Sequence, residues 1–432
     1  MNAIVEPGPL TGSVAAIPSK SMAHRLLICS ALSSGITDLD CPTRSQDIDA
    51  TMRCLRSLGA PAMLTRAGMR MVPITVGGTR TSTKIDVGES GSTLRFLLPI
   101  IAALGTTTEV MGHGRLAERP LAPLDEQLRE HGVTLSWNGA FPLHVSGKLA
   151  GGTFHLPGNV SSQYVSGLLL AAPLLDDDVE VLVSEPVQSR AYIDLTVSAL
   201  ATFGVTVSES RIKDDAGSYR RYGVDATARF VSPGVCAVEG DWSNAAFWLS
   251  AGSLGSEPLS VTGLDSQSRQ GDRSIMAALS LLGARMGRSR GIVAASRDSL
   301  HGATLDVSGI PDLVPPLAAV AAYADGTTRL TNAGRLRLKE SDRLVTVRDA
   351  LLALGGDARI EGDDLVIEGS ERLAGGTVDP AGDHRIAMLA AICAAYAQGP
   401  TTILGAQCVA KSYPSFFDDF RSLGGRVTEQ EV

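Results

Sequence analysis

The sequence predicts an α/β protein of two domains, each built from three βαβαββ units. With 432 residues, the chain is long enough for two cores of ordinary size. Its content of 44% apolar and 19% charged residues is typical of a well-packed protein and excludes a disordered chain. A polar opening followed by an apolar, small-residue helix recurs at starts roughly 70 to 80 residues apart. Because six units of that size exceed one core, two groups of three are expected.

The first helix of each unit is rich in Ala and Leu on nearly all sides, which predicts a buried helix. These helices are expected at 20–34, 91–104, 161–175, 243–254, 312–325 and 383–398. A glycine stands where five of them should end, at Gly35, Gly105, Gly255, Gly326 and Gly399. In the third unit Asp176–Asp178 replaces the glycine, so the boundary is still marked by residues that do not favour a helix.

A strand and a second helix follow each first helix. The strands are predicted from β-branched and threonine-rich pieces: ITDLDC, TTTEVMG, VEVLVS, PLSVTG, TTRLTN and TTILGA. The second helices are amphipathic and close on a glycine: DIDATMRCLRSLG, LAPLDEQLREHG, YIDLTVSALATFG, DRSIMAALSLLG, RLVTVRDALLALGG and FFDDFRSLGG. A hairpin such as ARIEGDDLVIEG would complete each unit.

The chain is expected to cross between the two domains twice, near Pro18 and near Glu239. A charged insert at 209–221 lengthens the spacing between the third and fourth units just before the second crossing. The strand GSVAAIP, at 12–18, resembles the pieces before the other first helices and is expected to complete the sixth unit. Domain I is therefore predicted as 1–18 plus 239–432, and domain II as 19–238. A two-strand hinge of this kind predicts a cleft that closes on a ligand.

Charge and cysteine usage exclude several classes of protein. A net charge of −8 disfavours a nucleic-acid partner. The six Cys form no CxxC pair and no metal-ligand spacing with His, so free thiols in a reducing compartment are expected. The first residues, MNAIVEPGPL, do not resemble a signal peptide, and the apolar run LLLAAPLL is too short to span a bilayer. We therefore expect a soluble, cytoplasmic protein.

The helix openings carry charge that ordinary capping does not explain. Lys20 and Arg25 stand in the first turns of a buried helix whose N-terminus already bears partial positive charge, which predicts an anion there. Further polar openings of first helices are Ser90–Gly91–Ser92 with Arg95, Ser161–Ser162–Gln163, Asp312 and Asp383–His384–Arg385. The second helices are preceded by Arg115 and Arg119, by Ser189, Arg190 and Tyr192, by Lys339, Glu340, Asp342 and Arg343, and by Lys411. If equivalent termini point the same way, two rings of them surround a pocket for several negative charges.

Each opening taken alone has a plainer interpretation. A serine pair is most often only a cap, and a charged turn is most often solvated. His384 by itself is more typical of a satisfied interior histidine, or of a neighbour that orients Arg385. Arg95 needs a partner in its apolar helix, either a substrate or a buried carboxylate. The fourth opening, SNAAFW, is expected to be structural, whereas the other five favour a binding site because their peculiarities fall at equivalent places.

Eight strings together resemble the 5-enolpyruvylshikimate-3-phosphate synthase (3-phosphoshikimate 1-carboxyvinyltransferase) family, in its order and spacing. They are PSKSMAHR, ESGSTLR, ERP, GNVSSQ, SRAYID, KESDRL, GDHRIAM and KSYPSFF, and the resemblance runs from about residue 8 to residue 425. It implies the two-domain enolpyruvyl-transferase fold, an inside-out α/β barrel of three units in each domain with a cleft between them. It also implies transfer of the enolpyruvyl group of phosphoenolpyruvate to the 5-hydroxyl of shikimate 3-phosphate, in the shikimate pathway of aromatic amino-acid biosynthesis. The family needs no metal or organic cofactor and is often monomeric.

The resemblance also implies a role for individual residues. Shikimate 3-phosphate would contact Lys20, Ser21, Arg25, Ser161, Ser162, Gln163, Ser189, Tyr192, Asp312 and Lys339. Phosphoenolpyruvate would contact Lys20, Gly91, Arg119, Gln163, Arg343, Arg385 and Lys411. Among these, Asp312 with the help of Lys20 would act on the 5-hydroxyl, and Glu340 would exchange a proton with the methylene carbon. Domain I would thus carry Asp312, Glu340, Arg385 and Lys411, and domain II most of the remaining contacts.

Two positions depart from the family pattern. Glu89 stands where many members have Asn, next to the expected phosphoenolpyruvate contact Gly91, so binding of phosphoenolpyruvate and of the family's inhibitor glyphosate is in question. Arg335 stands where an Asn often contacts shikimate 3-phosphate. Its role is either kept through a different hydrogen bond or lost.

Three other functions fit these motifs less well. The sister enolpyruvyl transferase that uses UDP-N-acetylglucosamine typically carries a Lys-Asn pair and a reactive loop Cys, whereas this chain has Lys20-Ser21 and no Cys in ERPLAPL. An RNA 3′-phosphate cyclase would need a C-terminal His, yet no His follows His384. A non-catalytic repeat scaffold would not need chemically matched changes at its helix openings.

Overall fold

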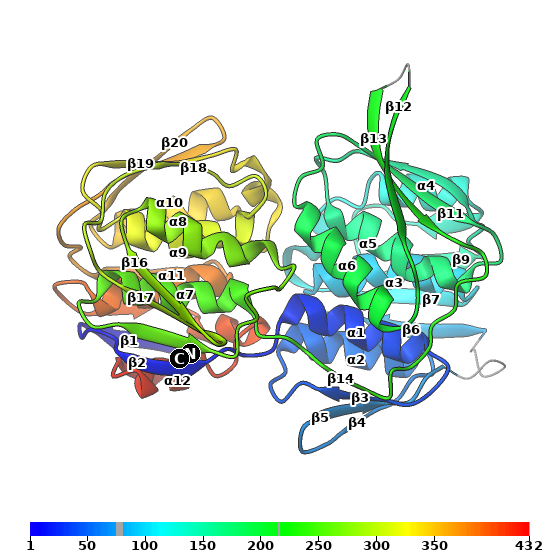
Figure 1. Ribbon diagram of the computed structural model, residues 1–432, viewed down its shortest axis with the longest axis horizontal. Helices are drawn as coiled ribbons and strands as arrows, with labels where there is room; N and C mark the ends of the chain where they lie inside the picture. The colour runs from blue at the N-terminus through cyan, green and yellow to red at the C-terminus, as the bar shows by residue number, and fades with distance from the viewer. Residues whose placement is uncertain (75–80, 215–216, 432) are drawn as a thin grey trace. The chain divides into compact units, whose positions relative to one another are not determined.

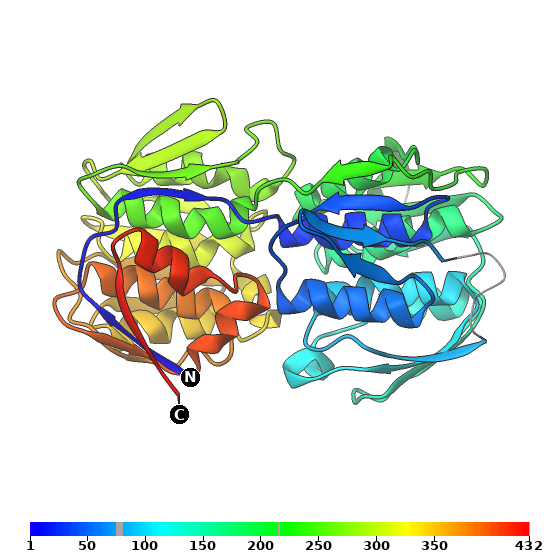
Figure 2. The same cartoon turned by 90° about the horizontal axis from the view of Figure 1, so that it is seen from below.

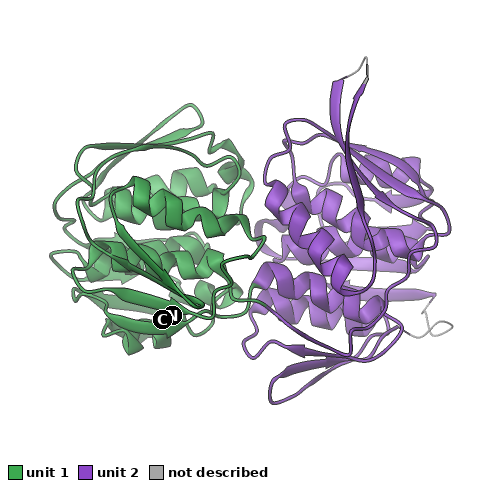
Figure 3. Ribbon diagram, viewed as in Figure 1, with its two compact units in different colours: residues 1–19, 239–432 green, residues 20–238 purple. Residues whose placement is uncertain are grey.

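The structure is a computed structural model that describes residues 1–74, 81–214 and 217–431. The chain divides into two compact units, which Figure 3 colours separately. Unit 1 comprises Met1–Ser19 and Glu239–Val432, and unit 2 comprises Lys20–Val238. The first division therefore lies one residue beyond the expected Pro18, and the second lies at the expected Glu239.

Each unit contains twelve short strands among the described residues. Unit 1 holds β1 (Asn2–Glu6), β2 (Gly12–Ala15), β15 (Leu259–Thr262), β16 (Arg285–Ser289), β17 (Ile292–Ser296), β18 (Thr304–Asp306), β19 (Thr327–Thr331), β20 (Asp357–Glu361), β21 (Asp364–Glu368), β22 (Gly376–Val378), β23 (Thr401–Ile403) and β24 (Arg426–Gln430). Unit 2 holds β3 (Thr37–Asp40), β4 (Ala62–Leu64), β5 (Gly68–Met71), β6 (Ser82–Asp86), β7 (Thr107–Met111), β8 (Val133–Ser136), β9 (Leu143–Gly147), β10 (Gly152–Leu156), β11 (Val179–Ser184), β12 (Ser208–Asp214), β13 (Gly217–Val224) and β14 (Val235–Ala237).

These strands form three four-stranded sheets in each unit, and all six sheets share one topology. Two parallel strands are extended by two antiparallel ones, as in the order β6-β7-β9-β8. The other orders are β14-β3-β5-β4 and β10-β11-β13-β12 in unit 2, and β16-β17-β15-β2, β18-β19-β21-β20 and β22-β23-β1-β24 in unit 1. The predicted sixfold βαβαββ repeat is therefore confirmed. The described parts of the charged insert, 209–214 and 217–221, belong to the paired strands β12 and β13, which project from unit 2 in Figure 1.

Each strand beside a crossing pairs within its own unit, although the helix that follows it in the chain belongs to the other unit. β2 precedes α1 (Lys20–Leu32) in the chain but pairs in parallel with β15 of unit 1. β14 precedes α7 (Trp242–Leu254) but pairs in parallel with β3 of unit 2. The prediction that GSVAAIP completes the sixth unit is wrong, because β1 fills that place between β23 and β24. Figure 2 shows β1 and β24 running side by side near the chain ends. β1 buries Ala3 and Val5 on one face and has a neighbour on each edge, which fixes its place in the sheet.

The first helices form the centre of each unit and the sheets lie outside them (Figure 1). They are α1, α3 (Gly91–Ala103) and α5 (Ser162–Ala171) in unit 2, and α7, α9 (Val314–Ala321) and α11 (His384–Ala395) in unit 1. Every residue of α7 and of α11 is buried. All-round apolar sequence and all-round burial agree, because a helix without a polar face cannot stay in contact with water.

The second helices lie where the sequence predicts them. They are α2 (Gln46–Ser57), α4 (Leu124–Glu130), α6 (Arg190–Thr202), α8 (Ile275–Leu281), α10 (Arg343–Ala353) and α12 (Phe416–Ser422). Short 3-10 helices precede several of them, including η1 (Gly114–Glu118), η3 (Gly271–Ser274), η5 (Gly334–Leu338) and η6 (Ala406–Lys411). The start of α2 is typical: Ser45 caps it by accepting from the amide of Ile48, and Asp47 and Asp49 lie in its first turn.

Two further expectations concern the whole chain. In the described residues no helix is long and apolar enough to cross a membrane. All six cysteines are free thiols, and all except the half-buried Cys236 are buried. Burial raises the pKa of the buried Cys54 and Cys408 to about 12, so these thiols stay protonated and unreactive at neutral pH.

Candidate active site

In unit 1, the N-termini of the three central helices converge on one cluster of charged side chains. We call Asp312, Lys339, Glu340, Arg343, Asp383 and Arg385 the unit 1 cluster. Asp312 belongs to η4 (Pro311–Leu313), which leads into α9, and Asp383 caps α11 by accepting from the amide of Arg385 at 3.0 Å. Arg385 also donates to Ser243 Oγ in the first turn of α7, at 2.8 Å. The predicted ring of helix N-termini is therefore present within this unit.

Arg343 is the centre of the unit 1 cluster. Its side chain is 1% exposed and contacts three carboxylates. The distances are 2.8 Å from Nη1 to Asp312 Oδ1, 2.6 Å from Nη2 to Glu340 Oε2 and 2.9 Å from Nε to Asp383 Oδ2. Although burial acts to lower the pKa of Arg343, the three carboxylates outweigh it and raise that pKa. Most donors of this guanidinium are therefore committed to carboxylates of the protein.

Asp312 is surrounded by cations. Lys339 Nζ donates to Asp312 Oδ1 at 3.0 Å, and Arg385 Nη2 lies 3.5 Å from Asp312 Oδ2. Burial acts to raise the pKa of Asp312, but the charges of Arg385, Lys339 and Arg343 prevail and hold that pKa well below its ordinary value. Burial lowers the pKa of Lys339, and Arg343 and Arg335 act in the same direction against Asp312 and Glu340. Asp312 is therefore ionised at neutral pH and stabilised in that form by its cations.

The remaining cation expected in this unit, Lys411, lies at the end of η6. Its Nζ donates to the carbonyl of Gly382 at 2.9 Å, in the loop that precedes Asp383. His384 is buried, as expected of an interior histidine, and its Nδ1 lies 3.9 Å from Asp383 Oδ1. Lys411 and the unit 1 cluster are thus linked through the opening of α11.

In unit 2, Arg25 donates hydrogen bonds to neutral oxygen atoms among the described residues and also lies over the Phe96 ring, with Cζ 4.9 Å from the ring centre. It is 2% exposed, and its Nε donates to Thr196 Oγ1 at 2.8 Å. Nη1 donates to the carbonyl of Ser21 at 2.6 Å, and Nη2 to the carbonyl of Tyr192 at 2.8 Å and to Ser166 Oγ at 3.4 Å. Burial lowers the pKa of Arg25 to about 10, so the group stays charged at neutral pH. A buried charge bound only to neutral groups is suited to receive an anion.

A second part of unit 2 joins α3 to α5 through Arg95. Arg95 Nη1 donates to Gln163 Oε1 at 2.9 Å, and Gln163 Nε2 donates to Ser92 Oγ at 2.9 Å. Arg95 Nη2 also donates to the carbonyl of Pro120 at 3.1 Å. The sequence predicted a substrate or a carboxylate as the partner of Arg95, whereas these contacts are to neutral oxygens. A Cβ at Gly91 would lie 2.7 Å from Nη1 of both Arg95 and Arg119, so Gly91 lets two guanidinium groups approach the backbone.

Because the family resemblance implies a phosphoenolpyruvate contact at Gly91, replacing Gly91 with Ala is expected to raise the KM for that substrate about tenfold or more, with a smaller effect on shikimate 3-phosphate. The added methyl group must displace Arg95 and Arg119, and one misplaced charge-assisted hydrogen bond costs about that much affinity. Steady-state kinetics with each substrate varied would measure it. Gly287→Ala on β16 is the control, because its Cβ would meet nothing closer than 3.9 Å. Equal KM values in G91A and wild type would contradict the prediction.

The other expected residues of unit 2 lie at helix openings. Lys20, the first residue of α1, is paired with Asp47 of α2 at 2.8 Å. Ser161 caps α5 by accepting from the amide of Gln163 at 3.3 Å, and Ser162 is the first, buried residue of that helix. Ser189 precedes α6 in a left-handed conformation, with φ of 53°. Such a conformation costs a serine about 1–3 kcal/mol, and strained backbone of this kind is often found at functional sites.

The two departures from the family pattern lie beside these groups. Glu89 is exposed and its carboxylate lies over Gly114 at the start of η1, since a Cβ at Gly114 would be 2.8 Å from Glu89 Oε2. Arg335 is half-buried in η5, and its charge acts on Lys339. Both positions therefore place an additional charge near expected substrate contacts.

Sequence reasoning missed several residues of these clusters. Asp383 was noted only as part of a polar opening, yet it binds two nitrogens of Arg343. Asp47 was not singled out as the partner of Lys20. The fourth opening, expected to be structural, contributes Ser243, whose Oγ accepts from Arg385 Nη2 at 2.8 Å. The signal for Asp383 was its place in the string GDHR, as an acidic residue immediately before a predicted helix. No local pattern indicated Ser243.

A row of buried hydroxyl groups links the openings of α1, α2 and α3. His24 Nδ1 lies 2.8 Å from Thr51 Oγ1, which lies 2.7 Å from Thr93 Oγ1, and Thr93 donates to Ser90 Oγ at 2.7 Å. His24 is 1% exposed, and its Nε2 has no hydrogen-bond partner among the described residues. Burial, and then the charges of Lys20 and Arg25, hold the pKa of His24 well below its ordinary value of 6.5. The row therefore holds a neutral imidazole.

Acidification is expected to destabilise the protein through His24. Since the pKa of His24 is lower in the folded chain, the unfolded chain binds one more proton below pH 6.5. Stability from this group is complete above pH 6.5 and falls by up to about 1.4 kcal/mol per pH unit as the pH drops toward the folded pKa. Urea unfolding of wild type and His24→Asn at pH 7.5 and 5.5 would test it: the stability advantage of wild type should shrink. His155→Asn, at an exposed position, is the control: its stability difference from wild type should be the same at both pH values. A stability difference between wild type and His24→Asn that does not depend on pH would refute the prediction.

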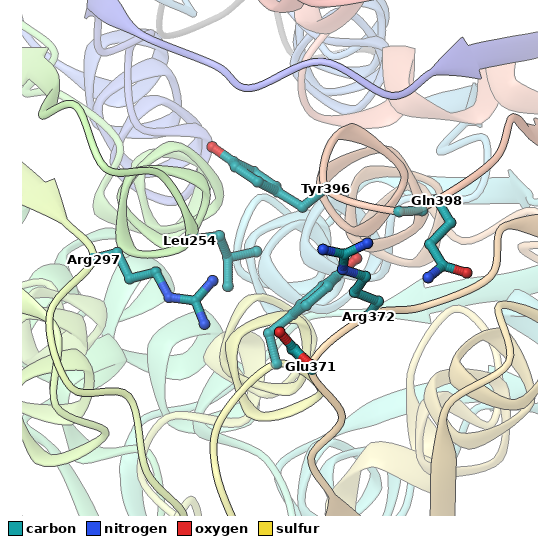
Figure 4. Close-up of a pocket in the computed structure, with 8 residues that line it drawn as sticks. Leu254, Arg297, Glu371, Arg372, Tyr396 and Gln398 are labelled. Carbon is teal, nitrogen blue, oxygen red and sulfur yellow. The ribbon is translucent and has the colours of Figure 1, made fainter.

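Unit 1 also contains a cavity of about 300 Å³, at the other end of its central helices. Its lining residues are Leu254, Arg297, Tyr323, Glu371, Arg372, Tyr396, Ala397 and Gln398, which include the last residue of α7 and those just beyond α9 and α11. Figure 4 shows the guanidinium groups of Arg297 and Arg372 turned toward the space between them. Cations at helix C-termini offset the negative end of the helix dipole, and none of the expected site residues lines this cavity. In the described parts of the chain, no three His, Cys, Asp or Glu side chains are grouped as metal ligands.

Comparison with known proteins assigns the chain to a family. The model of the family described as EPSP synthase (3-phosphoshikimate 1-carboxyvinyltransferase) matches residues 4–420. Relatives named 3-phosphoshikimate 1-carboxyvinyltransferase include one from Clostridium kluyveri, 40% identical over 99% of this chain and 98% of its own, and one from Clostridium perfringens strain 13, 39% identical over 99% of each. A solved EPSP synthase from Acinetobacter baumannii covers 100% of each chain with a TM-score of 0.80 at 23% identity, and so shares the fold. Matched along its whole length at this identity, the chain belongs to the EPSP synthase family.

Proposed function

We propose how this chain carries out the reaction of its family, the transfer of the enolpyruvyl group of phosphoenolpyruvate to the 5-hydroxyl of shikimate 3-phosphate with release of phosphate. This step belongs to the shikimate pathway of aromatic amino-acid biosynthesis. The observation that supports the assignment of roles is the unit 1 cluster, in which Lys339, Arg343 and Arg385 surround Asp312. The substrates bring two phosphates and two carboxylates, and such a set of cations suits them.

Asp312 is the base that accepts the proton of the 5-hydroxyl. In the substrate-free protein its cations hold its pKa well below the ordinary value, so it is a weak base. When an anionic substrate shares Lys339 and Arg385, less positive charge acts on Asp312 and its basicity rises. This coupling makes Asp312 effective only once the substrates are bound.

Glu340 exchanges a proton with the methylene carbon of phosphoenolpyruvate. Protonation of that carbon makes its neighbour cation-like, the hydroxyl oxygen bonds to it, and the later loss of the same kind of proton accompanies the departure of phosphate. Arg343 holds Glu340 Oε2 at 2.6 Å and thus fixes the carboxylate that does this work. Lys20, fixed by Asp47, assists at the 5-hydroxyl.

Substrate contacts are divided between the units. Shikimate 3-phosphate binds the group around Arg25, with Ser21, Tyr192, Ser161, Ser162, Gln163 and Ser189 in unit 2, and Asp312 and Lys339 in unit 1. Phosphoenolpyruvate binds Lys20, Gly91, Arg119, Gln163, Arg343, Arg385 and Lys411. The two crossings of the chain predict closure on the first substrate, and small-angle scattering should show compaction when shikimate 3-phosphate is added. We further propose that the protein acts as a cytoplasmic monomer. Size-exclusion chromatography with light scattering would measure its oligomeric state.

The test is phosphate release from phosphoenolpyruvate by the purified protein in EDTA. One reaction receives shikimate 3-phosphate and the other UDP-N-acetylglucosamine. Release only with shikimate 3-phosphate is expected, without a metal ion. Release only with the nucleotide sugar would mean that the roles of Ser21, Arg25 and Ser161 are wrong. No phosphate release in either reaction would refute the catalytic roles, and Glu89 would be the first residue to replace.

A further inference from the structure

The segment between β15 and α8 places a buried carboxylate beside the unit 1 cluster. Asp272 belongs to η3 and is 4% exposed. Gln270 fixes this segment, because its Nε2 donates to the carbonyl of Gly240 at 2.8 Å and its Oε1 accepts from the amide of Trp242 at 3.0 Å. The backbone that carries Asp272 is therefore bound to the start of α7, where Ser243 lies.

A row of polar contacts leads from Asp272 to Asp312. The side chain of Asp272 is hydrogen-bonded to Ser243, whose Oγ accepts from Arg385 Nη2 at 2.8 Å. Arg385 Nη2 lies 3.5 Å from Asp312 Oδ2, and its Nη1 donates to the Asp312 carbonyl at 3.2 Å. The guanidinium of Arg385 is thus held between two carboxylates, one of which it reaches through a hydroxyl group.

We propose that Asp272 is a positioning residue, which through Ser243 fixes the guanidinium of Arg385 for the carboxylate of phosphoenolpyruvate. The inference rests on the proposed function, which gives Arg385 that role. A guanidinium that is already oriented loses less side-chain freedom when it binds a carboxylate, so orientation adds affinity. Neither Asp272 nor Ser243 needs to touch the substrate for this effect.

The charges around Asp272 make its ionisation sensitive to pH near neutrality. It is faced by Asp312 from η4, by Arg385 from α11 and by Asp241 at the start of α7, while α8 contains no charged residue. Burial, and then the charge of Asp312, raise the pKa of Asp272 to about 6 against the opposing effects of Arg385 and Ser243. As the pH falls through about 6, Asp272 takes up a proton and fixes Ser243, and through it Arg385, less firmly. We expect the KM for phosphoenolpyruvate to rise as it does so.

The test compares KM for phosphoenolpyruvate between pH 5 and 8 in wild type and variants. Asp272→Asn is expected to raise KM about tenfold at pH 7.5, with a smaller change in kcat, and to remove the rise of KM below pH 6. Ser243→Ala should do the same, and the double variant should be no worse than Ser243→Ala alone, because both act through one row. Asp272→Glu should restore part of the affinity. Asp265→Asn, which removes an exposed carboxylate of the same loop, is the control and should change neither quantity.

Wild-type KM and pH dependence in both Asp272→Asn and Ser243→Ala would overturn the proposal. The proposal would also be overturned if both variants raised the KM for phosphoenolpyruvate but kept the wild-type pH dependence, because that result indicates a merely structural role. If Asp272→Asn does not fold, Ser243→Ala decides, since it removes only a hydroxyl group. Arg385→Lys separates this inference from the proposed function. If Arg385→Lys leaves KM unchanged, the role of Arg385 itself is wrong; if it raises KM while the other two variants do not, only the inference about Asp272 fails.

Discussion

Replacing Arg343 with Met is expected to abolish turnover and to lower the free energy of unfolding by about 3–5 kcal/mol. The 1% exposed guanidinium compensates Asp312, Glu340 and Asp383, which it contacts at 2.6 to 2.9 Å. Without it, the three carboxylates lose a shared cation in a poorly hydrated site, although Asp312 keeps Lys339 and Arg385, and loss of one partner of a buried ion pair costs more than the pairing itself contributes. Urea unfolding, followed together with phosphate release, would measure both effects.

Arg348→Met is the matched control for this experiment. Arg348 lies on the same helix α10, but it pairs with Asp349 near the surface, where an ion pair contributes little. Its replacement should change the free energy of unfolding by no more than about 0.5 kcal/mol and leave turnover intact. A variant R343M as stable as R348M would show that the three carboxylates find compensation elsewhere, and the central place given to Arg343 would be wrong.

Replacing Asp312 with Asn is expected to lower kcat by a factor of about 10²–10⁴, the usual contribution of a positioned acid or base. The amide oxygen can still accept from Lys339 and Arg343, which donate to Oδ1 in wild type at 3.0 and 2.8 Å, so the fold and much of the substrate binding should remain. What is lost is the ability to take the proton of the 5-hydroxyl. Steady-state kinetics should therefore show a far larger change in kcat than in either KM.

Asp306→Asn provides the comparison for Asp312→Asn. Asp306 lies in the same unit at the end of β18 and is exposed, and its hydrogen bonds are to the backbone amide of Ser308 and to the side chains of Ser308 and Asn332. Wild-type kcat is expected in this variant. A kcat of Asp312→Asn within tenfold of wild type would show that another group, for which Glu340 and Lys20 are the candidates, removes the hydroxyl proton.

The sequence by itself determined the six repeats, their two kinds of helix and the positions of most charged openings. These features are local: an all-apolar helix such as α7, a capped start such as Ser45 and a closing glycine act within a few residues. The order of the eight motifs was enough to indicate the family that the whole-chain comparisons show. Local periodicity and motif order survive without knowledge of which segments meet in space.

Only the tertiary structure decided which strand completes which sheet and which acids neutralise which cations. β1, β2 and β14 are short strands of similar pattern, and their partners lie roughly 200 to 400 residues away in the chain, so pairing depends on the packing of whole units. Likewise, Ser243 in the first turn of α7 meets Arg385 only because three helix N-termini converge. Contacts between distant segments leave no periodic trace in a single sequence, and the unit 1 cluster is built almost entirely from such contacts.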